Sequence, residues 1–112
     1  MNREWLVLAA RRLPQGRYGG SLRGRGAVGL GVSVVQDLLS DSALPRPGRV
    51  LWGLARSHTS GMNPARTIAL RAGLPVSTLA TTLNMACGSS LQALRFGCLC
   101  GRHIATAVNM RR

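Results

Sequence analysis

Apolar residues gather in short runs along this chain, separated by segments rich in glycine, proline and arginine. Trp5–Ala10 and Val50–Gly53 are continuous apolar runs of four to six residues, a length typical of strands buried on both faces. The residues from Leu79 to Met85 are also expected to be extended, and Ile104–Val108 has the composition of a final strand. The pattern therefore predicts several short strands.

Helical patterns lie between these runs. A stripe with steps of four, three and four residues predicts a helix over residues 27–39, and its members are Val28, Val32, Val35 and Leu39. Asn63 is a good helix cap, Pro64 suits the first helical position, and Gly73 followed by Pro75 ends the helix. A third helix is expected from Ser89 to Cys98, with one side formed by Leu91, Leu94 and Cys98. Residues 11–26 and 41–48 read as loops.

The alternation of strand and helix predicts an α/β fold, a mixed sheet with packed helices. A length of 112 residues fits one domain, assigned here to residues 1–112, and a hydrophobic content of 46% is enough for a packed core. Ala72–Leu94, the longest uncharged run, holds too many small and polar residues for a membrane span, so no membrane association is expected. The apolar run at Trp5–Ala10 is too short for a signal peptide, and we predict a cytoplasmic location.

The charge is strongly positive, because the chain has 15 basic residues and 3 acidic ones, giving a net charge of +12. All 15 basic residues are arginine. They are spread along the sequence without forming one basic helix or tail, and four aromatic residues are too few for a stacking platform. We therefore expect non-specific binding to nucleic acid and other polyanions, driven by phosphate contacts.

Cys87 stands out among the three cysteines because it lies between an extended segment and the expected start of a helix. The positive end of a helix and its unpaired N–H groups favour a thiolate, the reactive form of cysteine. A buried, inert cysteine is the alternative interpretation. Cys98 and Cys100 with His103 do not match a zinc-binding spacing, and no metal site is predicted.

Three sequence blocks, taken in order, resemble the N-terminal part of the thiolase family, which includes acetyl-CoA acetyltransferases and 3-ketoacyl-CoA thiolases. The blocks resemble the family patterns AARTPxGxxGGSL, GQNPAR and VNxxCGSGLxA, and they include Arg17–Leu22, Gly61–Arg66 and Leu83–Ala93. The resemblance is strongest over residues 6–97, whereas residues 98–112 read as a diverged tail. It implies a partial thiolase N-terminal layer.

By this resemblance, Cys87 is the nucleophile that takes an acyl group from acyl-CoA as a thioester. Acyl-CoA and CoA are then substrates, no further cofactor is needed, and the residues that bind CoA are unknown. The activating histidine and the second cysteine of the family lie in a later half that this sequence does not contain. His58 and His103 fall in no histidine motif of the family and are read as ordinary polar residues.

Four interpretations remain open at this point. The first is a thiolase-like acyl-CoA acyltransferase that is inactive alone because its catalytic set is incomplete. The second is a non-catalytic interaction fragment that forms homo-oligomers or binds a partner thiolase chain through exposed apolar surface. The third is a basic chain that binds polyanions, and the fourth is a degenerate gene product.

Overall fold

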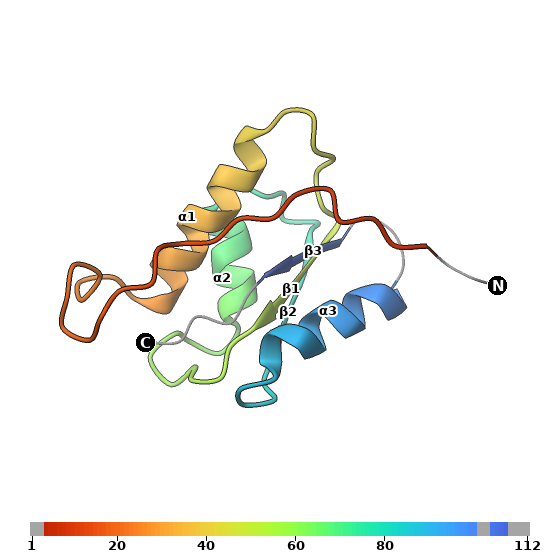
Figure 1. The fold of residues 1–112 in the computed structure, drawn as a ribbon. Coiled ribbons are helices and arrows are strands. Elements are labelled where there is room, and N and C mark those ends of the chain that lie inside the picture. Colours follow the sequence, from red (N-terminus) through yellow and green to blue (C-terminus); the bar gives the residue numbers. More distant parts are fainter. Residues whose placement is uncertain (1–3, 101–103, 108–112) are drawn as a thin grey trace.

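The structure is a computed structural model that describes residues 4–100 and 104–107. Its elements follow the chain in the order helix, strand, helix, strand, helix, strand (Figure 1). They are α1 (Ala27–Ser40), β1 (Arg49–Gly53), α2 (Pro64–Arg71), β2 (Leu79–Leu83), α3 (Ser89–Cys100) and β3 (Ile104–Ala107). The predicted α/β class is confirmed.

The described strands form one three-stranded sheet in the order β2-β1-β3. β1 pairs in parallel with both neighbours, with Arg49 opposite Leu79 in β2 and opposite Ile104 in β3. Parallel neighbours require a crossover, and α3 forms the one between β2 and β3. Both described pairings are parallel, so the antiparallel pairing of a mixed sheet is not among them.

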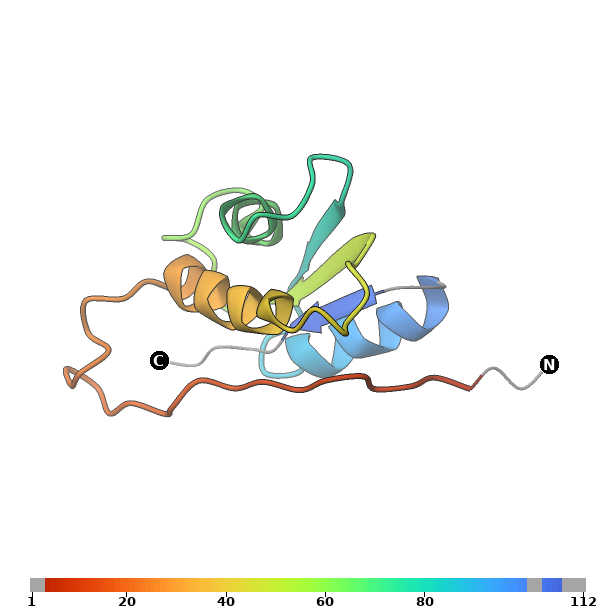
Figure 2. The same ribbon diagram turned by 90° about the horizontal axis from the view of Figure 1, so that it is seen from above.

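The core is built on the central strand β1. Val50, Trp52 and Leu54 face a cluster formed by α1 and α2, to which Val35 and Ile68 belong. These two helices lie on one face of the sheet and α3 on the other (Figure 2). Gly31 permits the close approach of α1, because a Cβ there would lie 2.6 Å from Ile68 Cδ1 and 2.8 Å from Trp52 Cζ2.

The predicted helices are present, but α3 buries a different side from the one its leucines suggest. Its buried residues are Ser89, Ala93 and Gly97, spaced by four residues, whereas Leu91 and Leu94 are exposed. The small side chains allow the helix backbone to lie close to β1. Within the described part of the chain, no helix has the length and apolar character needed to cross a membrane.

The prediction of a buried strand at Trp5–Ala10 is wrong. This segment runs extended along the outside of the molecule, and Leu6 and Val7 are 81% and 82% exposed (Figures 1 and 2). A buried strand needs a hydrogen-bonding neighbour, and this segment pairs with none of the strands β1, β2 and β3. The apolar composition of the run cannot by itself provide a partner.

Candidate functional site

Cys87 lies in the turn that joins β2 to α3, and Asn84 fixes the beginning of this turn. The Asn84 carbonyl oxygen Oδ1 accepts a hydrogen bond from the backbone N–H of Ala86 at 3.0 Å. The Asn84 Nδ2 donates to the backbone carbonyl of Ala55 at 3.2 Å. One side chain thereby shapes the turn and ties it to the segment that follows β1.

The buried hydroxyl of Ser89 fixes the other end of the turn. It donates to the carbonyl of Ala86 at 2.7 Å and accepts from the backbone N–H of Met85 at 2.9 Å. Ala86, between them, has φ +45°, a left-handed conformation that is uncommon for residues other than glycine. Such a conformation persists where the surroundings hold it, and the hydrogen bonds of Asn84 and Ser89 do so directly before Cys87.

Gly53 determines how closely α3 approaches the end of β1. A Cβ at this position would lie 2.5 Å from the carbonyl carbon of Ser89 and 2.7 Å from the backbone nitrogen of Ser90. Backbone atoms cannot move away as a flexible side chain can. The absence of a side chain at Gly53 is therefore required for the observed position of the turn.

The α2 helix holds the strand that leads to Cys87. Asn63 caps α2 by accepting from the N–H of Arg66, and its side chain also accepts from Thr82 Oγ1 at 2.7 Å and donates to the carbonyl of Ala80. The Arg66 guanidinium donates to the carbonyls of Val76 and Thr78. The cap at Asn63 is confirmed, whereas the bridges to β2 and its preceding loop were not predicted from the sequence.

Cys87 is exposed, so the alternative interpretation of a buried cysteine is wrong. The expectation of unpaired N–H groups at the helix start, however, is wrong for two of them. The N–H of Gly88 donates to the carbonyl of Met85 at 2.9 Å, and the N–H of Ser89 donates to that of Ala86 at 3.2 Å. These two groups are used inside the turn and do not point to a ligand of the thiol.

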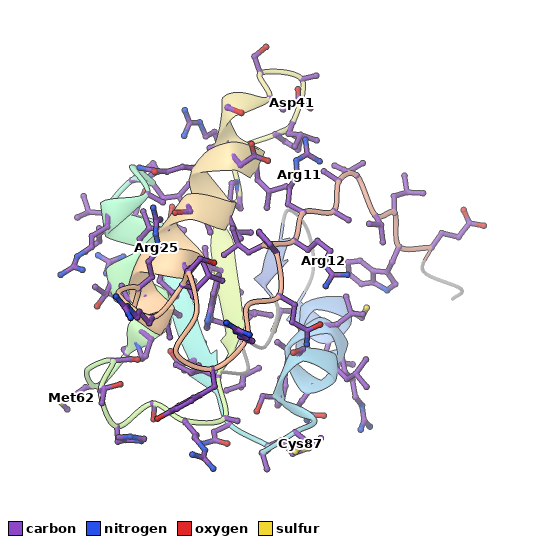
Figure 3. All side chains as sticks on the ribbon, turned by 60° about the vertical axis from the view of Figure 1, so that its left-hand side comes forward. Arg11, Arg12, Arg25, Asp41, Met62 and Cys87 are labelled. Carbon is purple, nitrogen blue, oxygen red and sulfur yellow. The ribbon has the colours of Figure 1, made fainter. Side chains whose placement is uncertain are left out.

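Cys87 opens onto a hollow of about 730 Å³ at the carboxyl end of β1. Ligands of open α/β sheets commonly bind outside the carboxyl ends of the strands. The lining comes from the 11–25 loop, from Leu30 and Val34 in α1, from Trp52, and from Cys87 with Ser90. Figure 3 shows this loop crossing between α1 and α3, with Arg12 on the side of α3 and Cys87 where that helix begins.

The structure gathers arginines that appear scattered in the sequence. Five of them line the hollow with Cys87, namely Arg11, Arg12, Arg17, Arg23 and Arg25. The Arg11 Nε donates to Asp37 Oδ2 at 2.7 Å, which joins the loop to α1. In the sequence, all five arginines lie in one glycine-rich segment of 15 residues, 11–25, and this clustering could have been noticed. The fold places this segment at the same hollow as the thiol.

The other residues considered for chemistry lie elsewhere. His58 is exposed and is not part of the described lining, and Cys98 is half-buried on α3. Cys100 is exposed, with the Arg49 guanidinium donating to its sulfur at 3.8 Å. His103 lies outside the described residues. Among the described residues, no group of three or more His, Cys, Asp or Glu side chains is placed to hold a metal ion.

Comparison with known proteins identifies the protein family of this chain. The model of the family "Thiolase, N-terminal domain" matches residues 5–104. The chain belongs to this family, as its three sequence blocks suggested.

Individual relatives are acetyl-CoA acetyltransferases. The Pseudomonas aeruginosa protein of that name is 43% identical over 94 residues, covering 82% of this chain and 24% of the relative. A probable acetyl-CoA acetyltransferase of Escherichia coli is 40% identical over 91 residues, covering 80% and 23%. The Acat5 thiolase of Ascaris suum, solved in complex with coenzyme A, superimposes with a TM-score of 0.66 at 31% identity, covering 70% of this chain and 21% of that one. The chain thus spans about a quarter of the length of these relatives.

Proposed function

We propose that Cys87 accepts an acyl group from an acyl-CoA thioester. The observation that carries the proposal is the exposed Cys87 thiol on a turn held by Asn84 and Ser89 and open to a hollow. Two further findings support it. The relatives are named acetyl-CoA acetyltransferases, and the Ascaris suum thiolase was solved with coenzyme A bound.

The proposed step is a thioester exchange. The Cys87 sulfur attacks the carbonyl carbon of the acyl-CoA, a bond forms between them, and the bond from that carbon to the CoA sulfur breaks. The acyl group then remains on Cys87 as a thioester, and CoA leaves as a thiol with the proton that Cys87 gave up. No oxidant or reductant is consumed.

We limit the proposal to this single acylation for the chain as given. The chain spans 24% of its P. aeruginosa relative, and the resemblance places the activating histidine and second cysteine of thiolases beyond this part. His58 is not part of the described lining of the hollow. Because catalytic residues act as a unit, losing the base removes most of the rate, and we expect slow acylation without turnover.

Intact-mass spectrometry after incubation with acetyl-CoA tests the proposal. We expect one acetyl group per chain, located on Cys87 by peptide mapping and absent from the Cys87→Ser variant. Cys98→Ser and Cys100→Ser are matched controls and should acetylate as the parent chain does. No adduct, or equal labelling of all three cysteines, would refute the proposal.

A second candidate function is a non-catalytic one, in which the chain forms homo-oligomers or binds a partner thiolase chain. The observation that favours it is the apolar outer side of α3, where Leu91 and Leu99 are 74% and 70% exposed. Several exposed apolar side chains on one helix are typical of an interaction site. Sedimentation velocity should show self-association that Leu91→Glu reduces. A parent chain that stays monomeric, alone and with a full-length thiolase, would contradict this candidate.

The cytoplasmic location remains a proposal. Relatives include bacterial proteins and a mouse protein named as mitochondrial. Fractionation of the source cells, with markers for each compartment, would distinguish the two locations.

A further inference from the structure

We propose that the 11–25 loop is a binding surface for single-stranded nucleic acid. Three exposed loop arginines, Arg12, Arg17 and Arg23, contact successive phosphates of the strand, and Tyr18 stacks on one base. The inference goes beyond acyl transfer, because it uses the outer surface of the loop and does not require the Cys87 thiol to react.

The first argument is the concentration of positive charge in this loop. It carries five of the 15 arginines, and the sequence has no acidic residue between Glu4 and Asp37. Arg11 is paired with Asp37, whereas the three loop arginines form no ion pair with any residue that the structure describes. The loop also projects from the molecule beside the start of α1 (Figures 1 and 2). A projecting surface with one sign of charge attracts polyanions through phosphate contacts.

The second argument is an aromatic ring among these charges. Tyr18 directly follows Arg17 and is 98% exposed, whereas the other described aromatic side chains are at most 43% exposed. A ring that packs against nothing in the fold offers its face to a base, and such stacking does not depend on the base sequence. One ring stacks on one base, so the arginines supply most of the attraction and Tyr18 adds a preference for unpaired bases.

The third argument is the backbone of the loop, which is folded into consecutive turns. The N–H of Gly20 donates to the carbonyl of Arg17 at 2.9 Å, and the N–H of Arg23 donates to that of Gly20 at 3.1 Å. A Cβ at Gly20 would lie 2.9 Å from the Arg17 carbonyl oxygen, so the first turn requires glycine at this position. The turns fix the backbone separation of Arg17 and Arg23 before a ligand arrives, which lowers the entropic cost of binding.

Gly24, between two arginines, is a glycine that the fold does not require. It does not have the left-handed conformation, and a Cβ there would meet no described atom within 4 Å. Neither the turn geometry nor the packing therefore explains the missing side chain. A bare backbone does allow close approach of a ligand to its N–H groups, which is a common use of glycine at phosphate contacts.

These features favour a single strand over a double helix and over a small phosphate ligand. The major groove of B-DNA accepts an α-helix or a two-stranded ribbon, and the 11–25 loop, all of which the structure describes, forms neither. The bases of a duplex are also stacked on one another and cannot stack on Tyr18. A mononucleotide presents its phosphates at one point, whereas arginines spread over residues 12–23 of a projecting loop match the successive phosphates of a strand.

Fluorescence anisotropy with a labelled oligouridylate of about 12 nucleotides, a length within the site sizes of single-strand binders, tests the proposal. We expect saturable binding at moderate salt, and we expect duplex RNA of the same length to compete about tenfold less well. ADP and CoA should not compete. Three phosphate contacts predict that the logarithm of the affinity falls with the logarithm of the salt concentration with a slope of about −2.

Variants of the loop make the test specific. Arg17→Gln and Arg23→Gln should each weaken binding by about fivefold and make the salt slope shallower by about 0.7, since each removes one phosphate contact. Tyr18→Leu should weaken binding by about fivefold with an unchanged slope, whereas Tyr18→Phe keeps the ring and should bind as the parent chain does. Arg46→Gln and Arg95→Gln are matched controls at exposed positions outside the loop, and they should change the affinity by less than about twofold. Circular dichroism would confirm that every variant is folded.

Failure of this proposal and failure of acyl transfer are distinguishable. Cys87→Ser should bind the oligonucleotide as the parent chain does while losing acylation. The proposal is overturned if the oligonucleotide does not bind, if the duplex binds equally well, or if ADP or CoA displaces the strand completely. It is also overturned if the control variants weaken binding as much as the loop variants, because net charge alone would then explain the attraction. Displacement by phosphatidylserine vesicles would likewise contradict it and would indicate a general anionic surface as the partner.

Discussion

At the scale of single residues, the site depends on side chains that do no chemistry themselves. Asn84 and Ser89 together make four hydrogen bonds, of which three are to backbone groups of Met85 and Ala86. They hold Ala86 in a left-handed conformation, and Cys87 follows directly. Reactivity of the thiol is therefore expected to depend on residues whose removal leaves the thiol itself in place.

The Ser89→Ala variant tests this dependence. It leaves the N–H of Met85 and the carbonyl of Ala86 without the buried hydroxyl of Ser89, so we expect the free energy of unfolding to fall by about 2 kcal/mol. With the turn loosened, acetylation of Cys87 should slow several-fold. Urea unfolding and intact-mass kinetics measure the two effects. The matched control Ser77→Ala, at an exposed position, should change neither, and an equal response of both variants would contradict the role assigned to Ser89.

At the scale of elements, the site is assembled by contacts between the ends of helices and strands. Asn63 joins the start of α2 to Ala80 and Thr82 in β2. At the carboxyl end of the neighbouring strand, Gly53 in β1 meets the start of α3 at Ser89. β2 and α3 are the two elements that flank Cys87, so each of these contacts sets one side of the turn.

We expect Asn63→Ala to destabilise the protein and to loosen the hold of α2 on β2. It removes the helix cap together with the bonds to Ala80 and Thr82, and the expected loss is about 2 kcal/mol. Thermal unfolding would measure it. Thr67→Ala serves as a control on the same helix, since its hydroxyl reaches the Asn63 carbonyl only at 3.5 Å. A loss at Asn63 no larger than that at Thr67 would argue against the bridging role.

Gly53→Ala should disturb the turn at Cys87 more than any other part of the molecule. The new methyl group would lie 2.5 Å from a backbone atom of Ser89, so α3 must shift away from β1. We expect a loss of stability of about 2 kcal/mol and strongly reduced acetylation of Cys87. Gly48→Ala is the control, since a Cβ there has no neighbour within 4 Å. Unchanged acetylation in Gly53→Ala would show that the turn does not depend on this close approach.

At the scale of the whole molecule, local signals predicted the elements, and the fold determined which surfaces they present. The α2 helix was predictable because its cap at Asn63 and its terminating Gly73, with φ +95°, act within one short segment. The buried side of α3 was not, because it depends on Gly53 in another element. Likewise, the grouping of arginines around Cys87 was not predictable, because it depends on the path of a loop whose sequence has no periodicity.

The apolar run at Trp5–Ala10 shows most clearly that a local pattern does not determine which residues are buried. Its composition predicts a buried strand, yet burial also needs a hydrogen-bonding neighbour, and the described pairings join only β1, β2 and β3. This difference is measurable, because Val7 is 82% exposed whereas Val50 is 1% exposed. Val50→Ala should lower the free energy of unfolding by about 2 kcal/mol, and Val7→Ala should change it by less than about 0.5 kcal/mol.

Equilibrium unfolding in urea, followed by far-ultraviolet circular dichroism, measures both variants on the same chain. The two substitutions remove the same atoms, so the comparison isolates the effect of burial. A loss at Val7 as large as that at Val50 would mean that the N-terminal run is packed as a strand in solution. The sheet would then have one more strand than those described, and the 11–25 loop would begin at the end of that strand.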